Sequence, residues 1–254
     1  MEPDLDVRKD NHVWTLTLRR PPHNFVNIEL LGRLADVLER LDGEPECRAV
    51  VLASEGKSFC AGADFSGSLV GGKVLDSARL YEQGLRLFRT RKPMVAAVHG
   101  AAIGAGVGLA LAADFRVTCA SARFSVNFNR LGFHPGFGLS VTLPRVVGPQ
   151  KAALLFYTGR RIGGTEAVAI GLADELADDA EVLRHAAELA KDIATSAPLA
   201  VQSTRLTLRH ALAGEVEAAL QRELGIQRDQ LESADFMEGV AAMAQRRTPV
   251  FRGC

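Results

Sequence analysis

The sequence lacks the features that mark several classes of protein. Its thirty basic and thirty acidic residues cancel, so no charge excess favours a nucleic-acid partner or a polybasic membrane surface. The four cysteines form no C-x-x-C pair and no zinc-type cluster with histidine, which predicts reduced thiols and no metal site. The amino end shows no secretory signal pattern, and we therefore expect a cytoplasmic protein.

Two nucleotide-binding motifs are also incomplete. A dinucleotide fingerprint that starts at Gly104 needs its third glycine at position 109, which is Leu109. A P-loop ending in Gly56-Lys57-Ser58 needs a glycine at position 51, which is Val51. The sequence therefore predicts neither kind of nucleotide site.

What the chain does have is a long uncharged run, Pro93–Ala113. Residues 94–98 suit a buried strand, four glycines between positions 100 and 108 indicate a turn, and residues 109–113 favour the start of a buried helix. The run is long enough to cross a membrane, but its glycines, alanines and His99 argue against insertion. The unpaired N–H groups of a helix start can hold an anion or a developing negative charge. Close packing of a helix on a sheet, without chemistry, is the open alternative.

Strand and helix patterns alternate along the first part of the chain, which predicts an α/β fold. A strand at 13–18 precedes a helix at 28–41 that Asn27 caps, and a strand follows at 48–53. A loop is expected at 67–72 and a helix at 76–90. The carboxyl part has helical spacing throughout, in the ranges 180–195, 199–213, 215–231 and 234–245.

Five motifs in order resemble the enoyl-CoA hydratase/isomerase, or crotonase, superfamily. They are Arg20-Pro-Pro-His-Asn-Phe-Val-Asn27, Phe59-Cys-Ala-Gly-Ala-Asp64, Lys92-Pro-Met-Val-Ala-Ala-Val-His-Gly100, Leu131-Gly-x-x-Pro-Gly136 and Glu238-Gly-Val-Ala-Ala. The resemblance implies a crotonase-like spiral of ββα units, with an α/β core over residues 1–195. It also implies a helical trimerisation region over residues 196–254, and hence a homotrimer or a dimer of trimers.

The resemblance further implies a site for an acyl-CoA thioester. Two backbone N–H groups, those of Ala63 and Ala105, would hold the thioester oxygen while it becomes enolate-like. CoA is then part of the substrate, and no separate cofactor is expected. The residues implied to contact the CoA thioester are Ala61, Gly62, Ala63, Asp64, Phe65, Ser66, Gly104, Ala105 and Phe128.

The chain departs from the family pattern at the acid–base positions. Hydratases of the family carry glutamates where this sequence has Gly108 and Phe128, and neither side chain can transfer a proton. His134 is the candidate replacement, with a hydrogen-bonded loop histidine as the alternative. Phe128, Phe133 and Phe137 favour an apolar, narrow pocket. The predicted function is acyl-CoA processing through an enolate, and the alternatives are a non-catalytic acyl-CoA binder and a trimer without a ligand.

Overall fold

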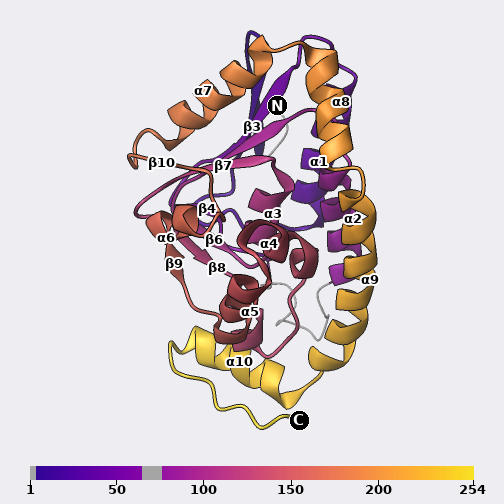
Figure 1. Ribbon diagram of the computed structural model, residues 1–254. Coiled ribbons are helices and arrows are strands. Elements are labelled where there is room, and N and C mark those ends of the chain that lie inside the picture. Colours follow the sequence, from indigo (N-terminus) through magenta and orange to yellow (C-terminus); the bar gives the residue numbers. More distant parts are fainter. Residues whose placement is uncertain (1–3, 65–75) are drawn as a thin grey trace.

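The computed structural model describes residues 4–64 and 76–254 (Figure 1). Phe65, Ser66 and the loop expected at 67–72 lie outside the described residues. A six-stranded sheet has the order β1-β2-β3-β5-β7-β10 and a four-stranded sheet the order β4-β6-β8-β9. The larger sheet consists of β1 Leu5–Asp10, β2 Val13–Leu18, β3 Ala49–Ser54, β5 Met94–Val98, β7 Phe115–Cys119 and β10 Glu175–Ala177. The smaller sheet consists of β4 Ser58–Cys60, β6 Ala101–Ile103, β8 Arg123–Ser125 and β9 Ile162–Gly163.

The chain passes between the two sheets in three similar turns. β3 continues into β4, β5 into β6 and β7 into β8, so that each turn places one strand in each sheet. From β2 to β10 the larger sheet is parallel, and β4, β6 and β8 are parallel in the smaller one. Crossovers between parallel strands need long connections, which α1, α2 and α3 supply. The predicted α/β spiral of ββα units is therefore present.

The helices cover the sheets on several sides. α7 packs on the larger sheet, α9 lies along α2 and α4, and α10 packs against the 3₁₀ helix η1 (Figure 1). Their bounds are α1 Ile28–Asp42, α2 Ser77–Phe88, α3 Ala105–Ala112, η1 Asn127–Leu131, α4 Leu139–Val147, α5 Pro149–Thr158, α6 Gly164–Ala169, α7 Val182–Thr195, α8 Pro198–Leu208, α9 Leu212–Gln230 and α10 Ala234–Ala244. The division of the chain into 1–195 and 196–254 stays a prediction.

Local sequence signals explain where the first two helices begin. The Asn27 side chain accepts a hydrogen bond from the Leu30 N–H at 2.9 Å, as expected for the cap of α1. Asp76 caps α2 in the same way, by accepting from the Arg79 N–H at 3.1 Å. Within the described residues, no helix is both long and apolar enough to span a bilayer.

The prediction for the uncharged run was right about β5 and wrong about where the helix starts. An additional strand, β6, follows β5, and α3 begins at Ala105 rather than near Leu109. Gly106 and Gly108 are therefore helical, although glycine is among the poorest helix formers. Tertiary packing overrides that preference, because a Cβ on Gly106 would lie 2.0 Å from the Cys60 carbonyl oxygen. Strand β1 and the short strands β8, β9 and β10 were also missed.

An ion-pair cluster joins α8 to the core at the end of α3. The Asp114 carboxylate lies 2.8 Å from Arg205 Nε and 2.7 Å from Arg209 Nη1, and it accepts from the Met94 N–H at 2.8 Å. Arg205 also donates to the Thr90 carbonyl oxygen. Burial is the main cause that lowers the pKa of Arg209. The cluster is largely buried, so its charges depend on one another for solvation.

Candidate functional site

The first element of the site is the turn that follows β4. Val26 N–H donates to the Gly62 oxygen, and Asp64 N–H donates to the Val26 oxygen, both at 2.9 Å. Gly62 has a φ of 111°, which favours glycine, and a Cβ there would lie 3.2 Å from the Ile103 oxygen. These two hydrogen bonds use the Gly62 oxygen and the Asp64 N–H, which flank Ala63 in the backbone. The Ala63 N–H therefore faces away from Val26. It donates to no acceptor among the described residues.

The second element is the start of α3. Gly104, at a φ of 53°, donates its N–H to the Ser125 oxygen at 2.8 Å, and its own oxygen accepts from Val107 N–H at 3.0 Å. The N–H of Ala105 is left without an acceptor in the described part of the chain, as is usual in the first turn of a helix. Gly106 packs directly on the Cys60 carbonyl, which fixes the start of α3 against the strand that leads to Ala63.

One cavity has both of these turns in its wall. This Ala63/Ala105 cavity has a volume of about 140 Å³. It brings together six of the predicted residues, which are Ala61, Gly62, Ala63, Gly104, Ala105 and Phe128. Asp64 does not line it, and its carboxylate lies 3.7 Å from Arg20 Nη2. The roles predicted for these residues in holding a thioester stay predictions.

The chain supplies the other walls from distant segments. They are Phe25, Ser77, Leu80, Tyr81, Ile103, Asn127, Leu131, Phe133, Phe137, Leu231 and Met243. Most were missed as site residues because they belong to separate elements and share no local pattern. Phe133 and Phe137 did give a signal, as aromatic residues that share one loop-rich segment with the predicted Phe128.

The described lining of the Ala63/Ala105 cavity has few groups that could transfer a proton. It contains no carboxylate and no histidine, and Tyr81 is its one titratable side chain. The Tyr81 hydroxyl donates to Gln227 Oε1 at 3.1 Å, and burial raises the pKa of this phenol. Burial also raises the pKa of the nearby Cys60 thiol to about 12, so Cys60 is not a thiolate at neutral pH. Among residues 4–64 and 76–254, no group of three or more His, Cys, Asp and Glu side chains is placed to hold a metal ion.

Phe137 occupies the space beside one of the two missing carboxylate positions. A Cβ on Gly108 would lie 2.5 Å from Phe137 Cδ1 and 3.0 Å from its Cγ. The ring is 1% exposed. A longer side chain at position 108 therefore cannot enter the cavity while Phe137 keeps its place.

This contact gives a stability prediction. We expect Gly108→Ala to destabilise the fold by about 1–3 kcal/mol, because the new methyl group overpacks the site. Phe137→Ala removes the two closest atoms, so the double variant should be at least about 0.5 kcal/mol more stable than the sum of the single effects. Urea unfolding of the four proteins measures this coupling. Strictly additive effects would contradict the steric account.

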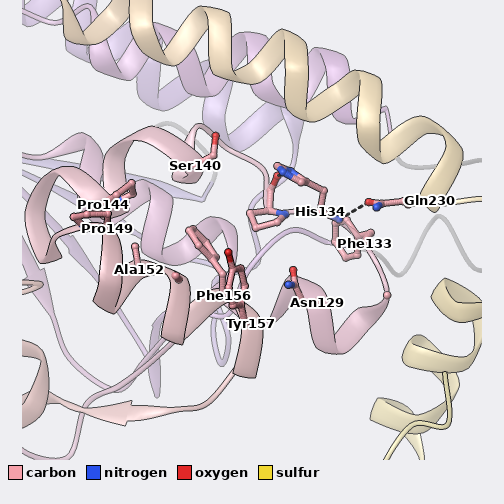
Figure 2. A pocket seen from close by; sticks show the side chains of 13 residues that line it. Asn129, Phe133, His134, Ser140, Pro144, Pro149, Ala152, Phe156, Tyr157 and Gln230 are labelled. Atoms are coloured by element: carbon pink, nitrogen blue, oxygen red, sulfur yellow. Dashed lines mark hydrogen bonds between the residues drawn. The ribbon is translucent and has the colours of Figure 1, made fainter. Parts of the chain in front are cut away.

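His134 lies in a different cavity (Figure 2). This His134 cavity has a volume of about 520 Å³. The His134 N–H donates to Gln230 Oε1 at 2.7 Å, and the ring Nδ1 lies 2.7 Å from the Pro135 oxygen. Phe133 lines both cavities, whereas His134 lines only its own. The structure therefore does not bring His134 together with Ala63 and Ala105, and its acid–base role stays a prediction.

A spiral α/β fold, with a cavity between two glycine turns of successive ββα units, is the architecture of the crotonase class. Residues 8–254 match the family model for enoyl-CoA hydratase/isomerase. The chain belongs to the enoyl-CoA hydratase/isomerase family.

Individual relatives agree over nearly the whole chain. It is 39% identical to a Mycobacterium tuberculosis protein named probable enoyl-CoA hydratase EchA14, over 93% of this chain and 96% of the relative. The crystal structure of an enoyl-CoA hydratase/isomerase from Pseudoalteromonas atlantica is 34% identical, with a TM-score of 0.88 over 98% and 100% of the two chains. That of carnitinyl-CoA hydratase from Mycobacterium avium is 31% identical, with a TM-score of 0.90 over 100% of both. The predicted fold class and superfamily are confirmed.

Proposed function

We propose that the Ala63/Ala105 cavity binds an acyl-CoA thioester whose carbonyl oxygen accepts hydrogen bonds from both N–H groups. One observation carries this proposal: two main-chain N–H groups without a described acceptor lie in the wall of one cavity. Two free N–H groups in the wall of one apolar cavity form a pair of donors that the oxygen of a ligand can satisfy. The N-terminal end of α3 adds a partial positive charge beside that oxygen.

An enolate is the intermediate that this arrangement would stabilise. When a proton leaves the carbon next to the thioester carbonyl, negative charge moves to the carbonyl oxygen, which the two N–H groups would hold. Each preorganised donor of this kind is worth about 3 kcal/mol in the transition state. The described lining offers no carboxylate pair, so the proton transfers would differ from those of a two-glutamate hydratase.

A non-catalytic acyl-CoA binder is the second candidate function. It is favoured by Gly108, by Phe128 and by the Phe137 ring that covers Gly108. A binder needs the two N–H groups and the apolar walls but no acid or base.

We also propose that the chain associates with copies of itself. On α8, Leu199 is 82% exposed, and Leu206 and Leu208 are also largely exposed. Apolar side chains gathered on one helix favour burial against a neighbouring copy. We propose that the protein is a homotrimer, or a dimer of trimers, in the cytoplasm.

The deciding experiment is calorimetric titration with a panel of CoA thioesters, followed by mass spectrometry of the products. Binding with conversion at ~1 per second or faster would support the enzyme. Binding without conversion in hydration, isomerisation and hydrolysis assays would support the binder. If no thioester binds and none raises the melting temperature, both candidates fail and the structural trimer remains.

The same assays decide the part played by His134. Because its ring lies in the other cavity, we expect His134→Ala to bind and convert thioesters within about twofold of the unchanged protein. A general acid or base contributes typically 10²–10⁴-fold to a rate. A loss of that size in turnover, with affinity unchanged, would support the predicted acid–base role of His134.

A further inference from the structure

The Phe137 ring sits in a slot that two glycines on different helices make. A Cβ on Gly84 of α2 would lie 2.9 Å from Phe137 Cε2 and Cζ, and a Cβ on Gly108 of α3 would lie 2.5 Å from Cδ1. Real Cβ atoms do not approach other atoms so closely. The slot therefore requires glycine at both positions as long as the ring is present.

The backbone at this ring is also unusual. Phe137 has a φ of 63°, a left-handed conformation that side-chain-bearing residues rarely adopt. It is held there by its neighbours: its ring meets Tyr81 edge-on at 6.2 Å with an interplanar angle of 86°, and Tyr81 is anchored by its bond to Gln227 of α9. Strained residues that the surrounding structure holds in place occur preferentially at ligand sites.

A second aromatic wall belongs to the same cavity. Phe128 lies over Gly104, where a Cβ would be 3.6 Å from its Cζ. It meets Phe133 edge-on at 5.4 Å, and Phe133 meets Phe236 at 5.5 Å. Phe128, Phe133 and Phe137 are each less than 8% exposed, so these walls are packed from behind.

From this packing we infer that Phe137 limits the acyl group of the ligand to a short hydrocarbon or aryl chain of about six carbons. The inference rests on the proposed function. An apolar cavity of roughly 150 Å³ takes one benzene molecule, and the Ala63/Ala105 cavity has a volume of about 140 Å³. Its walls are almost wholly apolar, so polar acyl groups would lose their hydration without gaining partners.

The test compares butyryl-, hexanoyl- and decanoyl-CoA by isothermal titration calorimetry. We expect the unchanged protein to bind hexanoyl-CoA more tightly than decanoyl-CoA. In Phe137→Ala the ratio of the decanoyl to the hexanoyl dissociation constant should fall at least tenfold, because each newly buried methylene is worth roughly a factor of four. Phe137→Leu should shift the ratio in the same direction by a smaller factor. If the alanine variant does not fold, the leucine variant takes its place in the comparison.

A variant with the opposite effect sharpens the test. Gly84→Ala pushes against the far end of the ring, and we expect it to weaken hexanoyl-CoA binding at least threefold more than butyryl-CoA binding. The matched control is Gly32→Ala on α1, where the new methyl lies at an ordinary 3.5 Å from the Gln83 side chain. This control should leave all three dissociation constants in their original ratios.

The outcomes separate the two proposals. If the unchanged protein binds none of the three esters, the proposed function fails and the inference fails with it. If the esters bind, but the ratios are the same in Phe137→Ala or Phe137→Leu as in the unchanged protein, the role of Phe137 is overturned and the proposed function stands. If Gly32→Ala changes the ratios of the dissociation constants as much as Gly84→Ala does, the role of Phe137 is also overturned.

Discussion

Replacing Ala105 by proline should lower turnover of a CoA thioester by about 10²–10³, the loss typical for one oxyanion donor. Proline has no N–H, so the substitution deletes one of the two proposed hydrogen bonds. Ala105 is the first residue of α3, and proline is well accepted at this position of a helix. The preceding Gly104 can keep its positive φ, so the turn should remain intact.

Ala105→Gly is the matched control, because it removes the methyl group and keeps the N–H. Its turnover should stay within a few-fold of the original, and circular dichroism should show both variants folded. If the chain is a binder without turnover, Ala105→Pro should weaken thioester binding only about two- to tenfold, since one hydrogen bond to a neutral carbonyl is worth about 0.5–1.5 kcal/mol. If the proline variant keeps the turnover of the glycine variant, the Ala105 N–H does not hold the thioester oxygen.

Replacing Asp114 by asparagine should destabilise the fold by about 3–5 kcal/mol. The substitution keeps the shape of the side chain and removes the negative charge between Arg205 and Arg209. Both guanidinium groups are mostly buried and already have one unpaired nitrogen each, Arg205 Nη2 and Arg209 Nε. They would therefore remain as uncompensated buried charges, which costs more than the loss of one hydrogen bond.

Urea unfolding at one fixed protein concentration measures this change, because any self-association makes stability depend on concentration. The control is Glu217→Gln, which breaks an exposed pair with Arg89 at 2.9 Å and should cost no more than about 1 kcal/mol. A loss of similar, small size in both variants would mean that solvent reaches the Asp114 cluster.

Glycine signals in the sequence indicated the turns of the candidate site, whereas the choice of the Ala63 and Ala105 N–H groups as donors came from the resemblance to the crotonase family. Ala63 and Ala105 each follow a glycine with a positive φ, and glycine-rich motifs mark such turns directly. The alternation of strands and helices was also predictable, because the local spacing of apolar residues indicates which element a segment forms. The start of α3 was not, because contact with Cys60 rather than helix preference decides it.

The side-chain part was not predictable from local patterns. His134 is next to Phe133 in sequence, yet only the structure shows that Phe133 lines both cavities and His134 one of them. The fit of Phe137 to Gly84 and Gly108 joins three segments that are distant along the chain. A single sequence carries no signal for such a fit, because glycines at 84 and 108 are indistinguishable from other helical glycines until the ring is placed between them.

The spread of the cavity walls along the chain has a consequence for biosynthesis. Among the described residues the walls begin with Phe25 and end with Met243 on α10, so every residue from 25 to 243 must leave the ribosome before these walls can assemble. Parallel strand pairing adds further contacts between distant segments, which slows folding. A molecule that occupies the cavity can therefore bind only after these segments have folded together, and its binding energy would stabilise all of them against unfolding and proteolysis.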